Sequence, residues 1–256
     1  MHQRQKKILD MLQHGKLLIP QAAEVLGVSQ MTLRRDLREL EGRKLLLQVK
    51  NGAVPHPAQY EPEPAADDDE LMQCKFMLAN LLYDTIMPVN SLFISTGTTA
   101  LAFAKVIARR NNLPVTVVTN SLPVASALFK TSCKVILLGG ELRTNSLDLI
   151  GPAAERNLLD YRVDYLVSGC DAALSEYGFY TSDMSLAQLE RKSIQIAEKS
   201  AIITDSSKFS RGALTRFAAL SDIDLLVTDS ALPELDRKNL QASAIEVLLG
   251  DSYTGS

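Results

Sequence analysis

Cysteine, histidine and long apolar segments are all scarce in this chain of 256 residues. Cys74, Cys133 and Cys170 are scattered singly, and their spacing fits neither a disulfide framework nor a metal site. No apolar run approaches the length of about 18 residues that a membrane span needs, and none near the amino terminus could serve as a signal peptide. We therefore expect a cytoplasmic protein that contacts no membrane and binds neither a metal nor a cofactor.

The histidines His2, His14 and His56 all lie near the beginning of the chain. The rest of the sequence contains no histidine that could act as a general acid or base, so carboxylates such as Glu141 and Asp171 are left for that role. This restriction argues against histidine-dependent catalysis in the larger part of the protein.

Charge is segregated along the chain. The formal net charge is −3, yet residues 1–50 contain ten lysines and arginines against five acidic residues. Positive charge concentrated in one segment is what binding to a phosphate backbone requires. Because the rest of the chain is acidic, the distribution predicts a small nucleic-acid-binding domain at the amino end.

A linker is predicted at residues 54–70. It contains four of the ten prolines, Pro55, Pro57, Pro62 and Pro64, and it ends in an acidic run. Proline removes backbone donors and stiffens the chain, and like charges repel, so we expect this stretch to be extended and exposed. The chain therefore divides into a domain over residues 1–53, the linker, and a larger domain over residues 71–256.

The first domain is predicted to hold three helices, over residues 3–13, 20–26 and 29–41. Gly27 and Val28 form a tight turn before the third helix, whose free amide groups Ser29 can cap. A β-hairpin is predicted after this helix, at residues 44–52, because the pair Asn-Gly is typical of a hairpin turn.

One face of the third helix is apolar and the opposite face is basic. Leu33, Leu37 and Leu40 recur at helical spacing and are expected to face the domain core. Donors on the opposite face suit a helix that enters the major groove. A helix-turn-helix used for protein contact, or a domain whose arginines are merely solvated, are the alternatives. The residues predicted to contact DNA are Ser29, Gln30, Thr32, Arg34, Arg35, Arg38 and, in the hairpin, Lys50.

The second domain is predicted to be of the α/β class. Seven short apolar runs are typical of buried strands, at residues 91–95, 115–119, 134–138, 165–168, 201–204, 225–228 and 245–249. Helices are predicted around residues 70–85, 99–110, 121–130, 152–160, 184–199 and 233–242. Continuous apolar strands that alternate with helices indicate a largely parallel sheet covered on both faces.

A turn rich in small and hydroxyl residues, Thr96-Gly97-Thr98-Thr99, follows the first of these strands. At a helix amino terminus such a turn offers free amide donors and a positive dipole, which makes an anion site. Four further strands end in polar or glycine-containing loops, at residues 119–121, 139–141, 169–171 and 205–209. In open parallel sheets the carboxyl ends of strands form the ligand site, so these loops are expected to meet there.

The stretch AAEVLGVSQMTLRRDL, at residues 22–37, resembles the helix-turn-helix signature of the DeoR family of bacterial transcriptional regulators. Asn51-Gly52-Ala53 is similar to the end of the family's wing, and the resemblance continues through the second domain. It implies a winged helix-turn-helix followed by a sensor domain similar to ribose-5-phosphate isomerase. It also implies a repressor of a carbohydrate-catabolism operon under the control of a phosphorylated sugar. From the two domains and the linker between them, we expect a homo-oligomer that binds double-stranded operator DNA.

The resemblance implies specific ligand contacts. The turn residues would cradle the phosphate, and residues from the other loops would line the rest of the pocket. The residues implied are Gly97, Thr98, Thr99, Asn120, Gly140, Asp171 and Lys208.

The sequence departs from the family pattern at three places. Ser95 stands where Asp is common, Ala172 stands where Gly often follows Asp171, and QLER at residues 188–191 replaces a usual Glu-x-Lys-Arg. These changes affect the identity of the ligand rather than the fold. A phosphosugar isomerase or hydrolase with an appended DNA-binding domain, and a sensor that binds nothing, are the alternatives to a ligand-controlled regulator.

Overall fold

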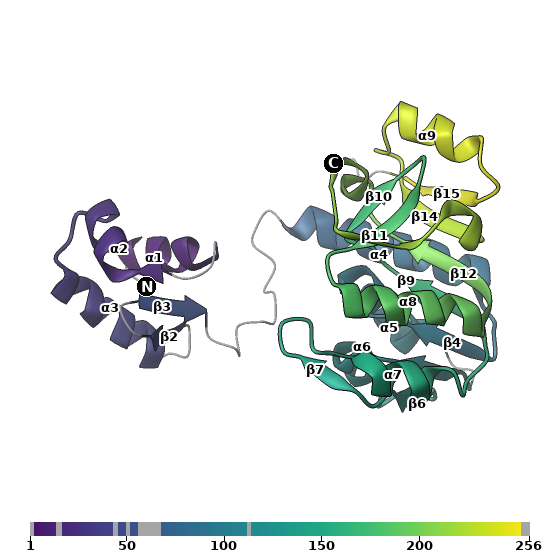
Figure 1. Cartoon of the computed structure of the whole chain (residues 1–256), viewed down its shortest axis with the longest axis horizontal. Coiled ribbons are helices and arrows are strands. Elements are labelled where there is room, and N and C mark those ends of the chain that lie inside the picture. Colours follow the sequence, from purple (N-terminus) through teal and green to yellow (C-terminus); the bar gives the residue numbers. More distant parts are fainter. Residues whose placement is uncertain are drawn as a thin grey trace. The chain divides into compact units, whose positions relative to one another are not determined.

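The computed structural model describes residues 3–13, 17–42, 46–49, 52–55, 68–111 and 114–251. The chain forms two compact units, residues 1–65 and 66–256, which are treated separately below (Figure 1). Lys50, Asn51 and most of the predicted linker lie outside the described residues. None of the helices in the described ranges has the length and hydropathy of a membrane span.

The first unit combines three helices with a small antiparallel sheet. The helices and strands are α1 (Gln3–Gln13), β1 (Leu17–Leu18), α2 (Ile19–Val25), α3 (Gln30–Gly42), β2 (Leu46–Val49) and β3 (Gly52–Pro55). The strands lie in the order β1-β3-β2, and the β2–β3 pair is the predicted hairpin. β1 was not predicted, because a strand of two residues leaves no periodicity in the sequence.

Local interactions position α3. Gly27 adopts a φ of +63° in the turn before the helix, and the backbone amide of Thr32 donates to Ser29 Oγ at 3.1 Å, as expected of a helix cap. Arg4 on α1 donates to both carboxylate oxygens of Asp36 on α3, at 2.6 and 3.0 Å. Leu37, the next residue along the helix, is fully buried. The helix is therefore fixed by its cap, by an ion pair and by its apolar face.

The second unit is built on a seven-stranded sheet whose pairings are all parallel. Its strands are β4 (Ser91–Ile94), β5 (Thr116–Thr119), β6 (Lys134–Leu137), β9 (Val163–Ser168), β12 (Ala197–Ile203), β14 (Leu225–Asp229) and β15 (Glu246–Gly250). They lie in the order β15-β14-β12-β9-β4-β5-β6. All seven predicted strands are present, and the predicted α/β class with a parallel sheet is confirmed.

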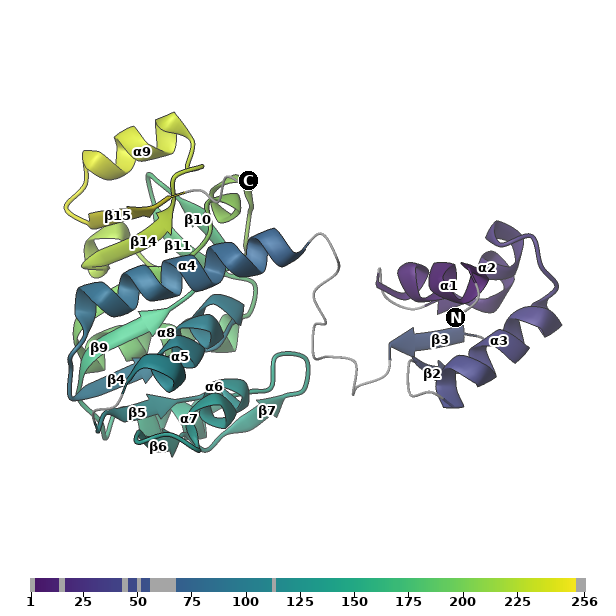
Figure 2. The ribbon, with the colours of Figure 1, turned by 180° about the vertical axis from the view of Figure 1, so that it is seen from behind.

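Helices cover both faces of this sheet (Figures 1 and 2). One face carries α4 (Asp68–Ile86), α5 (Thr98–Arg110) and α6 (Leu122–Leu128), and the other carries α7 (Gly151–Leu158), α8 (Met184–Ile196) and α9 (Glu234–Gln241). Alternation along β4 divides the core accordingly. Leu92 and Ile94 pack on the side of α5, while Phe93 packs with α7 and α8.

Two antiparallel additions were not predicted. β7 (Glu141–Arg143) and β8 (Asp148–Ile150) form a hairpin, and β10 (Ala172–Leu174), β11 (Gly178–Thr181) and β13 (Thr215–Ala218) form a three-stranded sheet. One boundary prediction was wrong. The helix expected to reach residue 199 ends at Ile196, because residues 197–200 belong to β12 and pair with β9.

The strand order reverses between β4 and β9, which are neighbours in the sheet. From β4 the chain proceeds through β5 to β6 on one side, and it then returns to add β9, β12, β14 and β15 on the other side. At such a reversal the connections leave toward opposite faces, so a crevice opens beyond the carboxyl ends of the two strands.

We expect Leu37→Ala to destabilise the first unit by about 2–5 kcal/mol, because a fully buried leucine leaves a cavity when truncated. The exposed neighbour Arg38 provides the matched control, and Arg38→Ala should change the free energy of unfolding by less than about 0.5 kcal/mol. Chemical denaturation followed by circular dichroism measures both. Equal effects of the two substitutions would contradict the packing of α3.

Candidate functional site

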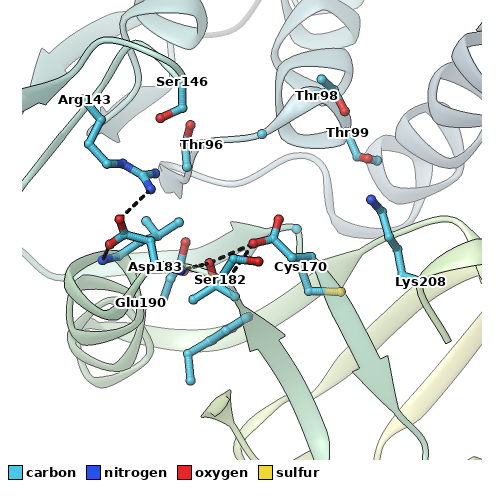
Figure 3. A pocket seen from close by; sticks show the side chains of 16 residues that line it. Thr96, Thr98, Thr99, Arg143, Ser146, Cys170, Ser182, Asp183, Glu190 and Lys208 are labelled. Atoms are coloured by element: carbon cyan, nitrogen blue, oxygen red, sulfur yellow. Dashed lines mark hydrogen bonds and ion pairs between the residues drawn. The ribbon is translucent and has the colours of Figure 1, made fainter. Parts of the chain in front are cut away.

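A cavity of about 250 Å³ lies at the strand-order reversal. Its walls come from the turn after β4, the loop after β9, the start of α8, the β7–β8 hairpin and the one-turn helix η2 (Ser206–Ser210). Figure 3 shows Arg143 and Asp183 at one end of the cavity, and Thr98, Thr99 and Lys208 together at the other. Five of the seven predicted ligand residues line it: Gly97, Thr98, Thr99, Asp171 and Lys208.

The turn after β4 presents backbone and hydroxyl groups to the cavity. Gly97 precedes the first residue of α5 and adopts a φ of +113°, a backbone conformation that residues other than glycine rarely take. No protein atom lies within 4 Å of the position that a Cβ would occupy there. The turn therefore leaves open space beside the amino end of α5, where free amide donors favour an anion.

The loop after β9 forms the opposite wall. Asp171 Oδ2 accepts from the Ser182 amide at 2.7 Å and from the Thr181 hydroxyl at 3.1 Å, which holds the loop against β11. Burial raises the pKa of Cys170 to about 12, so its thiol stays protonated at neutral pH. Lys208, on η2, forms no ion pair with any described residue and is free to meet an anion.

Arg143 is a cavity residue that the sequence analysis missed. It donates through Nε to Asp148 Oδ1 at 2.8 Å, and its Nη1 lies 3.2 Å from Asp183 Oδ2 (Figure 3). Burial raises the pKa of Asp183, but the Leu186 amide and Arg143 outweigh it and hold that pKa below its ordinary value. Arg143 follows the predicted loop 139–141 by two residues. It was not identified because the hairpin that carries it was not predicted.

The predicted ligand residues Asn120 and Gly140 do not line the cavity. The Asn120 carbonyl accepts from the Leu149 amide at 2.8 Å, and its side chain donates to the Leu149 carbonyl at 3.2 Å, so it attaches β8 to the end of β5. A Cβ on Gly140 would lie 2.7 Å from the Ile150 carbonyl oxygen, so glycine is needed there for close packing. Both residues have structural roles in the hairpin, and ligand contact by either stays a prediction.

Glu190, on α8, is a second cavity residue that was not predicted to bind ligand. Its carboxylate accepts hydrogen bonds from Ser95 Oγ and, at 3.0 Å, from Ser168 Oγ. Burial raises the pKa of Glu190 to about 7, against the opposing effect of these hydroxyl groups. Ser95 and Glu190 both depart from the family pattern, and the structure brings the two departures into contact.

The predicted DNA-contacting residues of α3 lie on its outer surface. Ser29, Gln30, Arg34, Arg35 and Arg38 are exposed, and Thr32 is partly exposed. Lys50 lies outside the described residues. Arg35 is 82% exposed and makes only a long contact of 3.5 Å with Glu39, so its guanidinium can turn to another partner.

The described residues contain no group of three or more histidine, cysteine, aspartate or glutamate side chains arranged to hold a metal ion. The cavity presents hydroxyls, amides, two cationic side chains and three carboxyl side chains, which are groups suited to recognition of a polar ligand. The lining residues that carry these charges are Arg143, Lys208, Asp171, Asp183 and Glu190.

Comparison with known families covers both units. Residues 4–56 match the DeoR-like helix-turn-helix domain, and residues 72–230 match the DeoR C terminal sensor domain. The glycerol-3-phosphate regulon repressor of Escherichia coli strain K12 is 30% identical over 223 residues, which cover 85% of this chain and 86% of the relative. The transcriptional regulator UlaR of Shigella sonnei is 30% identical over 219 residues, 82% of this chain and 84% of the relative.

Among solved structures, ribose 5-phosphate isomerase A from Methanocaldococcus jannaschii is similar with a TM-score of 0.40 and 16% identity, over 54% of each chain. The eIF2B beta structure from Chaetomium thermophilum is similar with a TM-score of 0.45 and 15% identity, over 62% of this chain and 51% of that chain. The chain thus spans about half the length of each of these two proteins.

We expect Gly97→Ala to lower the free energy of unfolding by about 1–3 kcal/mol, because alanine is strained at a φ of +113° even though the space is open. Gly212→Ala is the control, since a Cβ there also meets nothing within 4 Å and its φ lies outside the left-handed range. That substitution should be neutral or slightly stabilising. Thermal and denaturant unfolding compare the two, and indistinguishable variants would refute the geometry of the turn.

Proposed function

Because this chain belongs to the DeoR family of transcriptional regulators, we propose that it binds operator DNA through α3 and that a phosphorylated ligand in the cavity weakens this binding. The matched families and relatives are transcriptional regulators rather than enzymes. One relative is named for a glycerol-3-phosphate regulon, which supports a carbohydrate-catabolism operon as the target of this chain.

The observation that carries the DNA-binding proposal is the two-sided character of α3. Leu33, Leu37 and Leu40 are fully buried, while Arg34, Arg35 and Arg38 are exposed. The buried face anchors the helix, and the exposed guanidinium groups can reach guanine edges and phosphates in the major groove. We propose a homo-oligomer, a dimer or larger, whose paired first units meet repeated or palindromic half-sites.

The ligand proposal rests on the cavity end formed by Thr98, Thr99 and Lys208. Amides at the amino end of α5, two hydroxyls and an ammonium group together suit a phosphate. The hydroxyl, amide and carboxylate groups at the remaining walls suit the hydroxyls of a sugar. A hundredfold effect on operator binding would need about 2.7 kcal/mol of difference in ligand affinity between free and DNA-bound protein.

We further propose that Asp229 transmits the effect of ligand binding from the cavity to α4. Asp229 Oδ2 accepts from the Ser206 amide at 2.7 Å, and its Oδ1 accepts from the Ser206 hydroxyl at 2.7 Å, which fixes the turn that carries Lys208. Cys74 Sγ, on α4, also donates to Asp229 Oδ2, at 3.7 Å. Burial, followed by the charge of Asp229, raises the pKa of Cys74 to about 12, so the thiol keeps the proton that it donates.

The contact between Cys74 and Asp229 matters because α4 is the helix that follows the first unit in the chain. α4 begins at Asp68, directly after the residues that join the two units. A ligand that moves Lys208 would therefore act on η2, on Asp229 and then on the helix to which the DNA-binding unit is attached.

Fluorescence anisotropy tests the regulator. DNA from upstream of the protein's own gene and of neighbouring genes is titrated with the full chain, with and without a panel of sugar phosphates. We expect tight binding that one compound weakens. Arg35→Ala should abolish specific binding and leave ligand binding intact, whereas Arg162→Ala, an exposed arginine of the second unit, should change neither. Specific binding retained by Arg35→Ala would show that another face of α3 meets the DNA.

The pair Cys74→Ala and Cys74→Ser tests the route through Asp229. Alanine removes the donor and serine keeps one, so the ligand should weaken DNA binding about two- to threefold less in Cys74→Ala than in wild type, as expected for loss of about 0.5 kcal/mol. Cys74→Ser should behave as wild type. The measured quantity is the ratio of DNA affinities with and without the effective sugar phosphate. Equal ratios in the two variants would exclude this route.

A further inference from the structure

Glu190 is a buried carboxyl group that meets no cation. Glu190 is 3% exposed, and its carboxyl group has the hydroxyls of Ser95, Ser168 and Ser193 as partners. No ion pair in the described part of the chain includes it. A buried carboxylate without a cationic partner is unfavourable, and the neutral acid is the form that such surroundings tolerate best.

The hydroxyls of Ser168 and Ser193 can form hydrogen bonds with Glu190 in either its charged or its neutral form. Ser168 Oγ lies 3.2 Å from the Gly169 carbonyl oxygen as well as 3.0 Å from Glu190 Oε2, and Ser193 Oγ lies 2.8 Å from the Glu190 carbonyl oxygen. Each serine can turn its proton toward the backbone carbonyl and accept a proton from the carboxyl group instead. A change in protonation therefore needs rotation of hydroxyls and no movement of the backbone.

The other acids of the cavity have cationic or polar partners. Asp183 has Arg143 and the Leu186 amide as partners, and Asp171 accepts two hydrogen bonds and is exposed. Asp148, which Arg143 also pairs with, adds negative charge near Glu190. The cations of the lining are Arg143, already paired, and Lys208, at the opposite end of the cavity (Figure 3).

An anionic ligand would therefore enter a cavity that already holds more acidic than basic side chains. Neutralising one of the three carboxylates reduces their repulsion of the ligand. Glu190 is the carboxylate whose protonation costs the least free energy, because it is buried and has no cationic partner among the described residues. We propose that Glu190 determines which ligands the cavity accepts, by taking up one proton from solvent when a singly phosphorylated ligand binds. This inference rests on the proposed function only for the identity of the ligand.

In the proposed binding step, one proton is taken up together with the ligand. The carboxylate of Glu190 gains one proton from water, the new O–H group donates to Ser168 Oγ, and the Ser168 hydroxyl donates to the Gly169 carbonyl. The ligand keeps its two negative charges near Lys208. A ligand with a second acidic group near Glu190 would meet Asp171 and Asp183 as well, and the cavity should discriminate against it.

Infrared difference spectroscopy of the full chain tests the first step without any ligand. Wild type minus Glu190→Gln should show a protonated carboxyl band at pH 6 that disappears by pH 8, with a midpoint near the pKa of about 7. Ser95→Ala, which removes one donor to the carboxylate, should move the midpoint upward. Absence of the band at pH 6 would overturn the inference.

Sulfate, which remains a dianion over this pH range, serves as the probe of binding. Its affinity for wild type should fall by up to about tenfold per pH unit above pH 7, and its affinity for Glu190→Gln should be independent of pH. Lys208→Ala should bind sulfate weakly at every pH, which identifies the cavity as the site. Equal pH dependence of wild type and Glu190→Gln would overturn the proposal. Failure of every sugar phosphate to alter DNA binding would instead count against the proposed function and leave this result standing.

Discussion

The second unit depends on the link between the carboxyl ends of β4 and β9, where its strand order reverses. The Ser95 and Ser168 hydroxyls form this link by donating hydrogen bonds to Glu190. β4 and β9 are neighbours, and the Ser95 amide donates to the Val167 carbonyl at 3.0 Å, but the chain then leaves the two strands in different directions. A carboxyl group from α8 reaches both strand ends at once. The side chain that links these two strand ends therefore also lines the cavity.

The functional groups around this point differ in how strongly the fold constrains them. Gly97 is required by its backbone angle, and Arg143 is fixed by two carboxylates. Lys208 sits on a turn of five residues that is held through Asp229. The turn that carries Gly97 and the segment that carries Lys208 are therefore anchored by different parts of the fold.

The sequence predicted the elements whose signal is local. Seven apolar runs became seven strands because buried parallel strands are apolar on both faces, and α3 was recognisable from its leucine spacing and its cap. The β7–β8 hairpin and the β10-β11-β13 sheet were missed because their strands have only three or four residues. In the sheet, β13 also joins β11 from far along the chain. Arg143 was missed with the hairpin that carries it. Glu190 lies in the QLER segment at residues 188–191, which was noted as a departure from the family pattern, but nothing in the segment indicated that this side chain would line the cavity.

The contact between Cys74 and Asp229 connects α4 to the edge of the sheet at which the cavity lies. β14 ends at Asp229, at the same carboxyl edge as β4, β9 and β12, and α4 begins beside this edge. A ligand can shift an equilibrium only by the difference in its affinity for the two states. In the proposed mechanism this difference would arise at one edge of the sheet, where the turn after β4, the turn of Lys208 and the contact of Cys74 with Asp229 lie.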